Sequence, residues 1–379
     1  MGDGMQWIDE DSALARIVSE ITRGPVALDT EADSFHHYRE KVCLIQLTFE
    51  GRNLLLDTLS GLNMDLLRPV LENPEIHKVF HDADYDLRLL YRDFGLRIRG
   101  LFDTMIAARL VGERAFGLAS LLETYRGVRL QKKYQLADWS RRPLPREMME
   151  YAVSDTRHLL GLSRVLEEKL EGLGRIGWAR EEFLRRESVR WTDEPEPPEA
   201  FSKVKGSSRM SRKELAILRD LCAWRDTLAR ERNVPLFKVL GDQVLVSLCR
   251  QTPRSTMELS RVKGIPARLL RGPLASKLLE KIERSMALPD SEWPVRPERV
   301  RRRVAGEVVE SIRAIRKRRD TLARRLDLEP SLLATKGVLE SIVSRMGRGE
   351  DWRTIPELRS WQVELLEPLL ASGGPSSAT

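Results

Sequence analysis

Residues 26–31 read Val-Ala-Leu-Asp-Thr-Glu, an apolar run that ends in two acidic side chains. The run follows Pro25 and is short, so it predicts a β-strand over residues 25–30. Side chains two positions apart on a strand point to the same face. Asp29 and Glu31 are therefore expected to share one face of a rigid support, where they can bind one cation together.

The segments around this strand alternate between strand-like and helix-like patterns. Short apolar runs bounded by Gly, Asn, Asp or Pro predict further strands at residues 42–49, 53–57 and 78–80. Apolar residues at helical spacing predict helices at residues 11–21, 64–72, 85–94, 104–111, 118–125 and 146–160 and in the stretch up to 190. The first half of the chain is thus expected to be an α/β layered domain.

Two further acidic residues belong to separate motifs. Asp86 lies in His-Asp-Ala-Asp-Tyr-Asp-Leu-Arg-Leu-Leu, residues 81–90, and Asp155 ends Tyr-Ala-Val-Ser-Asp, residues 151–155. Tyr151 stands four positions before Asp155, so the two side chains share a helix face. Crowded carboxylates are best explained by hard divalent cations such as Mg²⁺ or Mn²⁺, which prefer oxygen ligands. The four carboxylates together predict a metal site.

Such a site suits the hydrolysis of a phosphodiester bond. Two ions about 4 Å apart make a water nucleophilic and neutralise charge on the leaving oxygen. The Tyr151 hydroxyl can orient the attacking water while it stays protonated, because its unperturbed pKa is about 10. Each motif alone is more typical of an ordinary turn or amphipathic helix. The prediction of a metal site depends on the three motifs occurring in order, the first on a strand, the second at the start of a helix and the third on a helix.

Charge is divided unevenly along the 379 residues. The net charge is +7, yet residues 1–200 hold 28 Lys and Arg against 35 Asp and Glu, while residues 201–379 hold 36 against 22. This division indicates metal chemistry in one half and attraction of a polyanion, such as nucleic acid, by the other. Solvated Arg-rich helix faces are the alternative explanation.

Cysteine usage and the chain start bear on location. Cys43, Cys222 and Cys249 lie far apart and form no Cys-x-x-Cys pair, which suits a reducing cytosol. Residues 1–20 lack the basic start and apolar run of a signal peptide, and no segment is long and apolar enough to span a bilayer. We therefore expect a cytoplasmic protein that does not bind membranes.

The second half differs in pattern from the first. Residues 193–198 read Asp-Glu-Pro-Glu-Pro-Pro, which is typical of a linker. Beyond the linker, apolar residues fall at helical spacing, so this half is expected to be all-α. The hexapeptide Arg-Asp-Thr-Leu-Ala-Arg occurs at residues 225–230 and again at 319–324. The repeat predicts two related helical modules.

The three acidic segments resemble the three motifs of the DEDD family of 3′-to-5′ exonucleases. Asp29-Thr30-Glu31, residues 81–86 and residues 151–155 carry this likeness, together with Trp-Ser-Arg-Arg-Pro-Leu at residues 139–144. Tyr151 is typical of the tyrosine subclass, and the whole pattern is most similar to the ribonuclease D family. The resemblance implies a ribonuclease-H-like domain, with a mixed sheet and flanking helices, that holds two divalent metal ions.

The resemblance also implies roles for residues. It places Asp29, Glu31 and Asp155 around one ion, and Asp29 and Asp86 at the second. Asp86 is preferred within its motif because the family's acid stands immediately before a Leu-x-x-Leu helix. Asp84 is the alternative ligand and is otherwise expected to be a helix N-cap.

The basic half resembles the helicase-and-RNase-D C-terminal (HRDC) domain, a small helical nucleic-acid-binding module. Leu-Cys-Ala-Trp-Arg at residues 221–225 and Asn-Val-Pro at residues 233–235 contribute to this likeness. We expect an exonuclease domain at residues 1–192 and a linker at 193–210. A first HRDC domain is expected at 211–290, a weaker HRDC-like domain at 291–372 and a disordered tail at 373–379.

The resemblance implies a metal-dependent 3′-to-5′ exoribonuclease that trims tRNA precursors and other structured RNAs to nucleoside 5′-monophosphates. We expect the protein to be a monomer. A DNA exonuclease and a non-catalytic RNA-binding scaffold are the alternatives. Basic and histidine side chains are candidates for substrate contacts near the cleft: His81, Lys132, Lys133, Arg141 and Arg142. The runs at residues 299–303 and 316–319 are candidates for phosphate contacts. His36 and His37 are expected to make rim contacts or hydrogen bonds rather than bind metal.

Overall fold

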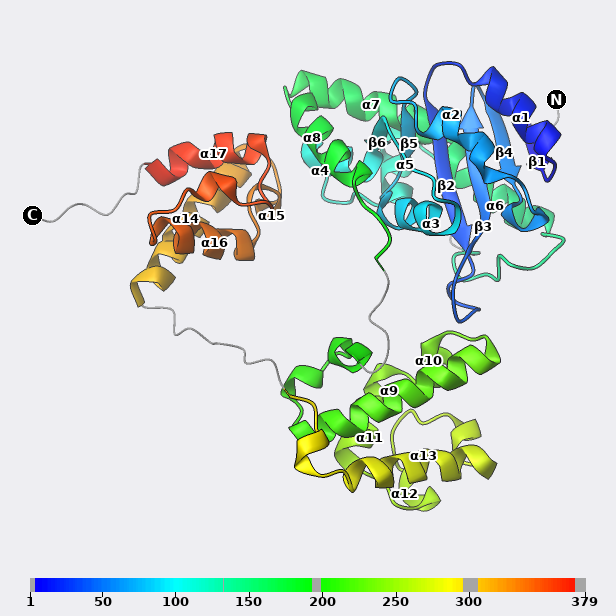
Figure 1. Cartoon of the computed structure of the whole chain (residues 1–379). Coiled ribbons are helices and arrows are strands. Elements are labelled where there is room, and N and C mark those ends of the chain that lie inside the picture. Colours follow the sequence, from blue (N-terminus) through cyan, green and yellow to red (C-terminus); the bar gives the residue numbers. More distant parts are fainter. Residues whose placement is uncertain (1–3, 132, 193–198, 296–305, 372–379) are drawn as a thin grey trace, which may run out of the picture.

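A computed structural model describes residues 4–131, 133–192, 199–295 and 306–371 (Figure 1). Its N-terminal domain contains a six-stranded sheet with the order β1-β4-β3-β2-β5-β6. β2 is antiparallel to β3 and parallel to β5, so the sheet is mixed. The strands are β1 (Met5–Ile8), β2 (Val26–Ala32), β3 (Val42–Phe49), β4 (Arg52–Leu56), β5 (Lys78–Phe80) and β6 (Leu101–Asp103). The predicted α/β layered domain is confirmed.

Sequence patterns missed both edge strands. β1 and β6 have only four and three residues, too few to show a clear alternation of apolar and polar side chains. Each becomes a strand by pairing in parallel with its neighbour, β4 for β1 and β5 for β6.

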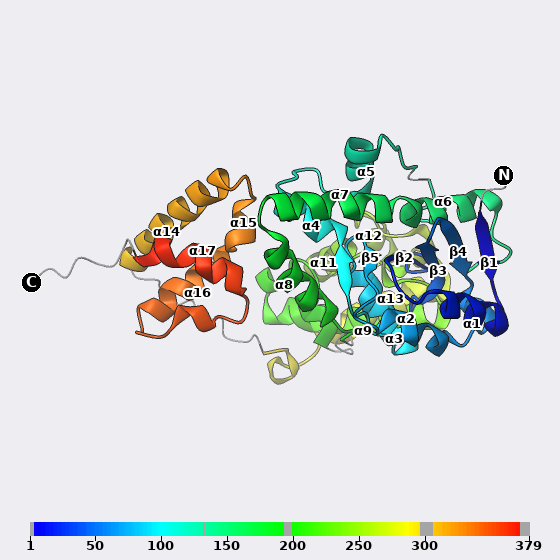
Figure 2. The same cartoon turned by 90° about the horizontal axis from the view of Figure 1, so that it is seen from above.

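Helices cover both faces of the sheet (Figure 2). α6 and α7 lie on one face, and α1, α2 and α3 lie on the other. On β4, Leu54 and Leu56 pack into the main core, while Leu55 points the opposite way and packs with Trp139 and α6. The helices are α1 (Asp11–Glu20), α2 (Arg68–Leu71), α3 (Asp84–Phe94), α4 (Thr104–Val111), α5 (Leu118–Arg126), α6 (Arg146–Arg157), α7 (Leu159–Gly172) and α8 (Ile176–Glu187).

A first helical unit follows, with its own apolar core. Its long helix begins at a capping box, in which Ser211 and Glu214 each satisfy the other's backbone N–H. Val204 and Met210, which fall within the predicted linker 193–210, are buried in this core. Residues 193–198 lie outside the described residues. The helices are α9 (Arg212–Arg232), α10 (Leu236–Val239), α11 (Asp242–Gln251), α12 (Thr256–Ser260) and α13 (Gly272–Met286).

A second helical unit repeats this arrangement with α14 (Gly306–Arg325), α15 (Pro330–Leu333), α16 (Lys336–Met346) and α17 (Ser360–Ala371). In the first unit the buried Arg225 donates to the Leu240 carbonyl at 3.1 Å. In the second, the buried Arg319 donates to the Ala334 carbonyl at 2.5 Å. The two bonds join residues at corresponding positions of the sequence repeat, so the predicted internal repeat is confirmed.

The second unit packs firmly against the N-terminal domain. The rings of Trp178 on α8 and Trp361 on α17 stack with centroids 4.8 Å apart and an interplanar angle of 15°. Arg359 forms an ion pair with Glu182 at 2.7 Å, and Arg175 donates to the Leu326 carbonyl at 2.6 Å. This unit therefore shares apolar and polar contacts with the domain that carries the acidic motifs.

Cys43, Cys222 and Cys249 are unpaired and buried. Among the described residues, none of the helices has the length and apolar character needed to cross a bilayer.

Candidate metal centre

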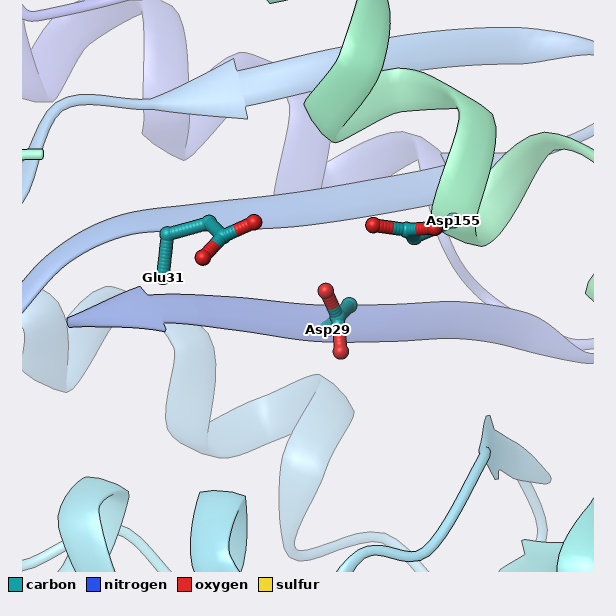
Figure 3. A group of neighbouring side chains, drawn as sticks. All are labelled: Asp29, Glu31 and Asp155. Carbon is teal, nitrogen blue, oxygen red and sulfur yellow. The ribbon is translucent and has the colours of Figure 1, made fainter. Parts of the chain in front are cut away.

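Three carboxylates converge above the central part of the sheet. Asp29 and Glu31 project from β2, and Asp155 projects from α6, which lies across β2, β3 and β4 (Figure 3). One ligand oxygen from each lies within 4.8 Å of the other two. The i, i+2 spacing on the strand places the first two side chains on the face that α6 covers. This distance allows all three oxygens to contact one divalent cation.

The electrostatics of this cluster favour a cation. Loss of water raises the pKa of Asp29 well above its usual range, and the neighbouring charges of Asp86, Asp155 and Glu31 raise it further. Desolvation, followed by the charges of Asp155 and Asp86, also raises the pKa of Glu31. Desolvation raises the pKa of Asp155 to about 7. Repulsion among crowded carboxylates is relieved by a bound divalent ion, which favours their ionised form.

Asp86 joins the cluster through a neighbour on β2. It lies on α3, is buried, and accepts a hydrogen bond from the Thr30 hydroxyl at 2.5 Å. Desolvation raises the pKa of Asp86 to about 7, although the Thr30 hydrogen bond opposes that rise. Asp86 is not among the three carboxylates with mutually close oxygens, but its charge raises the pKa of both Asp29 and Glu31.

Asp84, the alternative ligand in the second motif, has other partners. Arg88 pairs with it at 2.7 Å and Arg186 at 2.8 Å, and these contacts lower its pKa. A carboxylate neutralised by two guanidinium groups has little need of a metal ion. The expectation that Asp84 caps the helix is wrong, because the N-cap is Ala83 and Asp84 is the first residue of α3.

Tyr151 stands beside the carboxylates in a fixed orientation. Its ring meets the Tyr134 ring edge-on at 5.9 Å, and the Trp139 ring centroid lies 6.1 Å away. Desolvation, followed by the charges of the acidic cluster, raises the pKa of Tyr151 far above its usual range. The phenol therefore stays protonated at neutral pH and can donate a hydrogen bond.

Gln46 is a polar residue of this region that sequence patterns did not single out. It pairs with Asp29 across β2 and β3, is fully buried, and neither amide atom has a hydrogen-bond partner within the described residues. Residues directly opposite on paired strands point to the same face, so its amide lies next to Asp29. A buried amide with no partner is costly unless water or a ligand satisfies it. The site thus fits a hydrated metal ion.

Some of the predicted substrate contacts are exposed side chains, and others have hydrogen-bond partners within the protein. Lys133 and Arg141 are exposed, and Lys133 lies over the Tyr134 ring at 4.9 Å. These two stay predictions, and Lys132 lies outside the described residues. His81 hydrogen-bonds Thr104 at 2.9 Å, and desolvation lowers its pKa to about 4, so it is neutral.

Arg142 has several hydrogen-bond partners within the protein. Its guanidinium donates to both Asp57 carboxylate oxygens, at 2.9 and 2.6 Å, and to the Cys43 and Trp139 carbonyls. These bonds anchor the segment before α6 to the sheet. Asp57, which holds the guanidinium, lies 85 residues away in the sequence, and the substrate contact of Arg142 stays a prediction.

His36 and His37 make hydrogen bonds, as expected. His36 contacts the Leu136 carbonyl at 3.0 Å, while His37 contacts Ser140 at 2.9 Å and Asn233 at 3.0 Å. The loop after β2 thereby contacts both the segment that precedes α6 and the first helical unit.

The family models of two known domains match the chain. A 3′-5′ exonuclease model matches residues 5–171, and the HRDC domain model matches residues 214–282. The fold and the three converging acidic segments thus define the class of protein as a 3′-to-5′ exonuclease.

Relatives narrow this class. Ribonuclease D of Pseudomonas paraeruginosa is 32% identical over 368 residues, which cover 95% of each chain. The crystal structure of Escherichia coli RNase D, described as an exoribonuclease involved in structured RNA processing, covers 98% of each chain with 27% identity and a TM-score of 0.71. A Bifidobacterium adolescentis structure covers 97% of this chain and 96% of its own, with 26% identity and a TM-score of 0.81. The chain belongs to the ribonuclease D family of 3′-to-5′ exoribonucleases.

Proposed function

We propose that this exoribonuclease trims the 3′ ends of structured RNAs, tRNA precursors foremost, and releases nucleoside 5′-monophosphates with the aid of two Mg²⁺ or Mn²⁺ ions. The convergence of Asp29, Glu31 and Asp155 within 4.8 Å carries this proposal. The substrate class rests on the description of the Escherichia coli relative, which acts on structured RNA.

Each acidic residue has a proposed role. Asp29, Glu31 and Asp155 hold one ion, and Asp29 with Asp86 holds the second. When bound, the ions supply an activated water and neutralise charge on the leaving oxygen. Tyr151 keeps its proton and donates to the attacking water or to the phosphate, since it cannot act as a base at neutral pH.

The organisation of the chain supports this function. The proposed organisation is an exonuclease domain at residues 1–192, a linker at 193–210, HRDC-type domains at 211–290 and 291–372, and a tail at 373–379. The protein is proposed to act as a monomer in the cytoplasm, with RNA as its partner.

The test is degradation of a 5′-labelled RNA hairpin with a single-stranded 3′ tail, beside a DNA of the same sequence at the same salt concentration. We expect stepwise shortening of the RNA from its 3′ end with Mg²⁺ or Mn²⁺, and none with EDTA. Asp29→Asn is the matched inactive control. Internal cleavage, faster cleavage of the DNA, or full activity of Asp29→Asn would overturn the proposal.

A further inference from the structure

Helix α14 of the second helical unit carries an exposed basic face. Arg313, Arg316, Lys317 and Arg324 are exposed, and with Asp320 they line a shallow hollow of about 510 Å³. With about 100° of rotation per residue, these five positions fall within a sector of roughly 100°. The face extends about 16 Å along the helix axis, a length that spans several phosphates of a nucleic-acid strand.

The opposite face of α14 is apolar and packed. Leu322 lies about 180° from Arg313 on the helix and is 5% exposed in the main core. The helix is therefore fixed to the body of the protein by one side, and its basic residues are held outward by that packing.

The single carboxylate on this face does not cancel its charge. Asp320 accepts hydrogen bonds from two nitrogens of Arg319, at 2.8 and 2.5 Å, and Arg319 is buried. The exposed Arg316 also pairs with Asp320, at 3.8 Å. This one carboxylate is outnumbered by the four exposed cations, so the face keeps a net positive charge. The sequence run at 316–319 is only partly available, because Arg318 donates to the Leu369 carbonyl at 2.9 Å and is half-buried.

The first helical unit uses the equivalent face differently. The repeat aligns Asp320 and Arg324 with Asp226 and Arg230. Asp226 accepts a hydrogen bond of 2.5 Å from the Tyr38 hydroxyl, and the Arg230 guanidinium lies 5.6 Å from the Tyr38 ring centroid. In the first unit this face is therefore docked on the loop that follows β2.

In the second unit, side chains of this face pair within α14 itself: Arg316 with Asp320 at 3.8 Å, and Arg324 with the Thr321 hydroxyl at 3.2 Å. The first unit supplies Cys222 and Ala223 at the positions of Arg316 and Lys317. Arg313 and Arg324 align with Arg219 and Arg230, so the second unit carries more positive charge than the first only at the positions of Arg316 and Lys317.

We propose that the α14 face binds the sugar-phosphate backbone of the RNA substrate, and that the second helical unit rather than the first supplies the main phosphate contacts outside the catalytic domain. This inference rests on the proposed function. Neutralising phosphates with Arg and Lys releases counterions, so each lost contact lowers affinity and flattens its salt dependence.

The experiment compares two full-length triple variants with the wild-type protein. Arg313→Gln/Arg316→Gln/Lys317→Gln removes charge from the α14 face. Lys277→Gln/Lys281→Gln/Arg284→Gln removes the same charge from one exposed face of α13 in the first unit. Binding of the fluorescent RNA hairpin is titrated in EDTA, which prevents degradation, at several salt concentrations.

We expect the α14 variant to bind at least tenfold more weakly, with a slope of log affinity against log salt reduced by about 2. The α13 variant should bind as the wild type does, and all three proteins should melt at similar temperatures. Wild-type affinity of the α14 variant, or a larger loss in the α13 variant, would overturn the inference. Metal-dependent degradation by the wild type, measured in parallel, tests the proposed function separately.

Discussion

The Thr30 hydroxyl donates a hydrogen bond of 2.5 Å to the Asp86 carboxylate, and this bond joins the first acidic segment to the second. Thr30 lies between Asp29 and Glu31 on β2, so its side chain points to the opposite face of the strand. The strand thus presents two carboxylates to α6 and a hydroxyl to α3. Thr30, which lies between Asp29 and Glu31, therefore fixes the orientation of the Asp86 carboxylate.

Replacing Thr30 with Val should weaken binding of the second metal ion. Without the hydroxyl, the pKa of Asp86 rises further, and less of it is ionised at neutral pH. A hydrogen bond to a charged group is worth about 1.5–3 kcal/mol, so affinity should fall roughly 10- to 100-fold. Calorimetric Mn²⁺ titration measures this, with Thr30→Ser as the control that keeps the hydroxyl. Equal affinities of Val and Ser variants would contradict the positioning role.

Tyr151→Phe should slow turnover without loss of metal binding. The ring packing against Tyr134 and Trp139 is kept by Phe, and only the protonated hydroxyl is removed. Loss of one donor to the reacting groups should lower kcat roughly 100-fold. Single-turnover degradation of the RNA hairpin gives the rate, and the Mn²⁺ titration gives the affinity. A parallel loss in both measurements would show that Tyr151 supports the ion instead.

The metal-free protein should lose stability as pH rises. The pKa of Asp86 and that of Asp155 are raised to about 7, while unfolded Asp has a pKa of about 3.9. The folded state therefore binds more protons than the unfolded chain between these values, and the free energy of unfolding falls across this range. Melting temperatures from pH 5 to 8 in EDTA should show the decline.

Saturating Mn²⁺ should remove most of this decline, because an ion bound to the folded state stabilises the ionised carboxylates. Asp155→Asn is the matched variant, and its metal-free profile should be flatter than that of the wild type. Identical profiles for the two proteins in EDTA would show that these carboxylates do not control the pH dependence.

Gln46→Leu should lower the affinity for Mn²⁺ without lowering the stability of the metal-free protein. Burying the amide without a partner costs about 1–3 kcal/mol, so the metal-free variant should be as stable as the wild type or more stable. Its Mn²⁺ affinity should fall severalfold, because the amide no longer contacts the hydrated ion. Ile45→Val, on the neighbouring position of β3, should leave the affinity unchanged. An unaltered affinity in Gln46→Leu would rule out the contact.

Trp361→Ala should destabilise the protein by about 3–5 kcal/mol, since a fully packed aromatic side chain is lost from the core shared by two units. Urea unfolding measures the change. Leu184→Ala is the control, because Leu184 on α8 is 64% exposed and its loss should cost less than about 0.5 kcal/mol. A small effect of Trp361→Ala would mean that the second unit is held by its polar contacts.

Local patterns in the sequence were sufficient to predict much of the fold and the residues of the acidic cluster. Two carboxylates at i and i+2 on a strand, and a Tyr and an Asp at i and i+4 on a helix, follow from the geometry of single elements. The repeat at residues 225–230 and 319–324 likewise predicted two related units. The strand and helix spacings depend on residues that are close in the sequence, and the repeat depends on comparing two segments of the sequence directly.

Contacts between segments that are distant in the sequence could be identified only from the tertiary structure. Arg186 on α8 pairs with Asp84, about 100 residues away, and Asp57 holds Arg142. The first contact gives Asp84 a partner that Asp86 does not share, and the second gives Arg142 a partner within the domain. Gln46 became notable only when β3 placed it opposite Asp29. The periodicity of one element determines which face a side chain occupies, but the charge or donor opposite that face comes from another element that only the folded chain brings near.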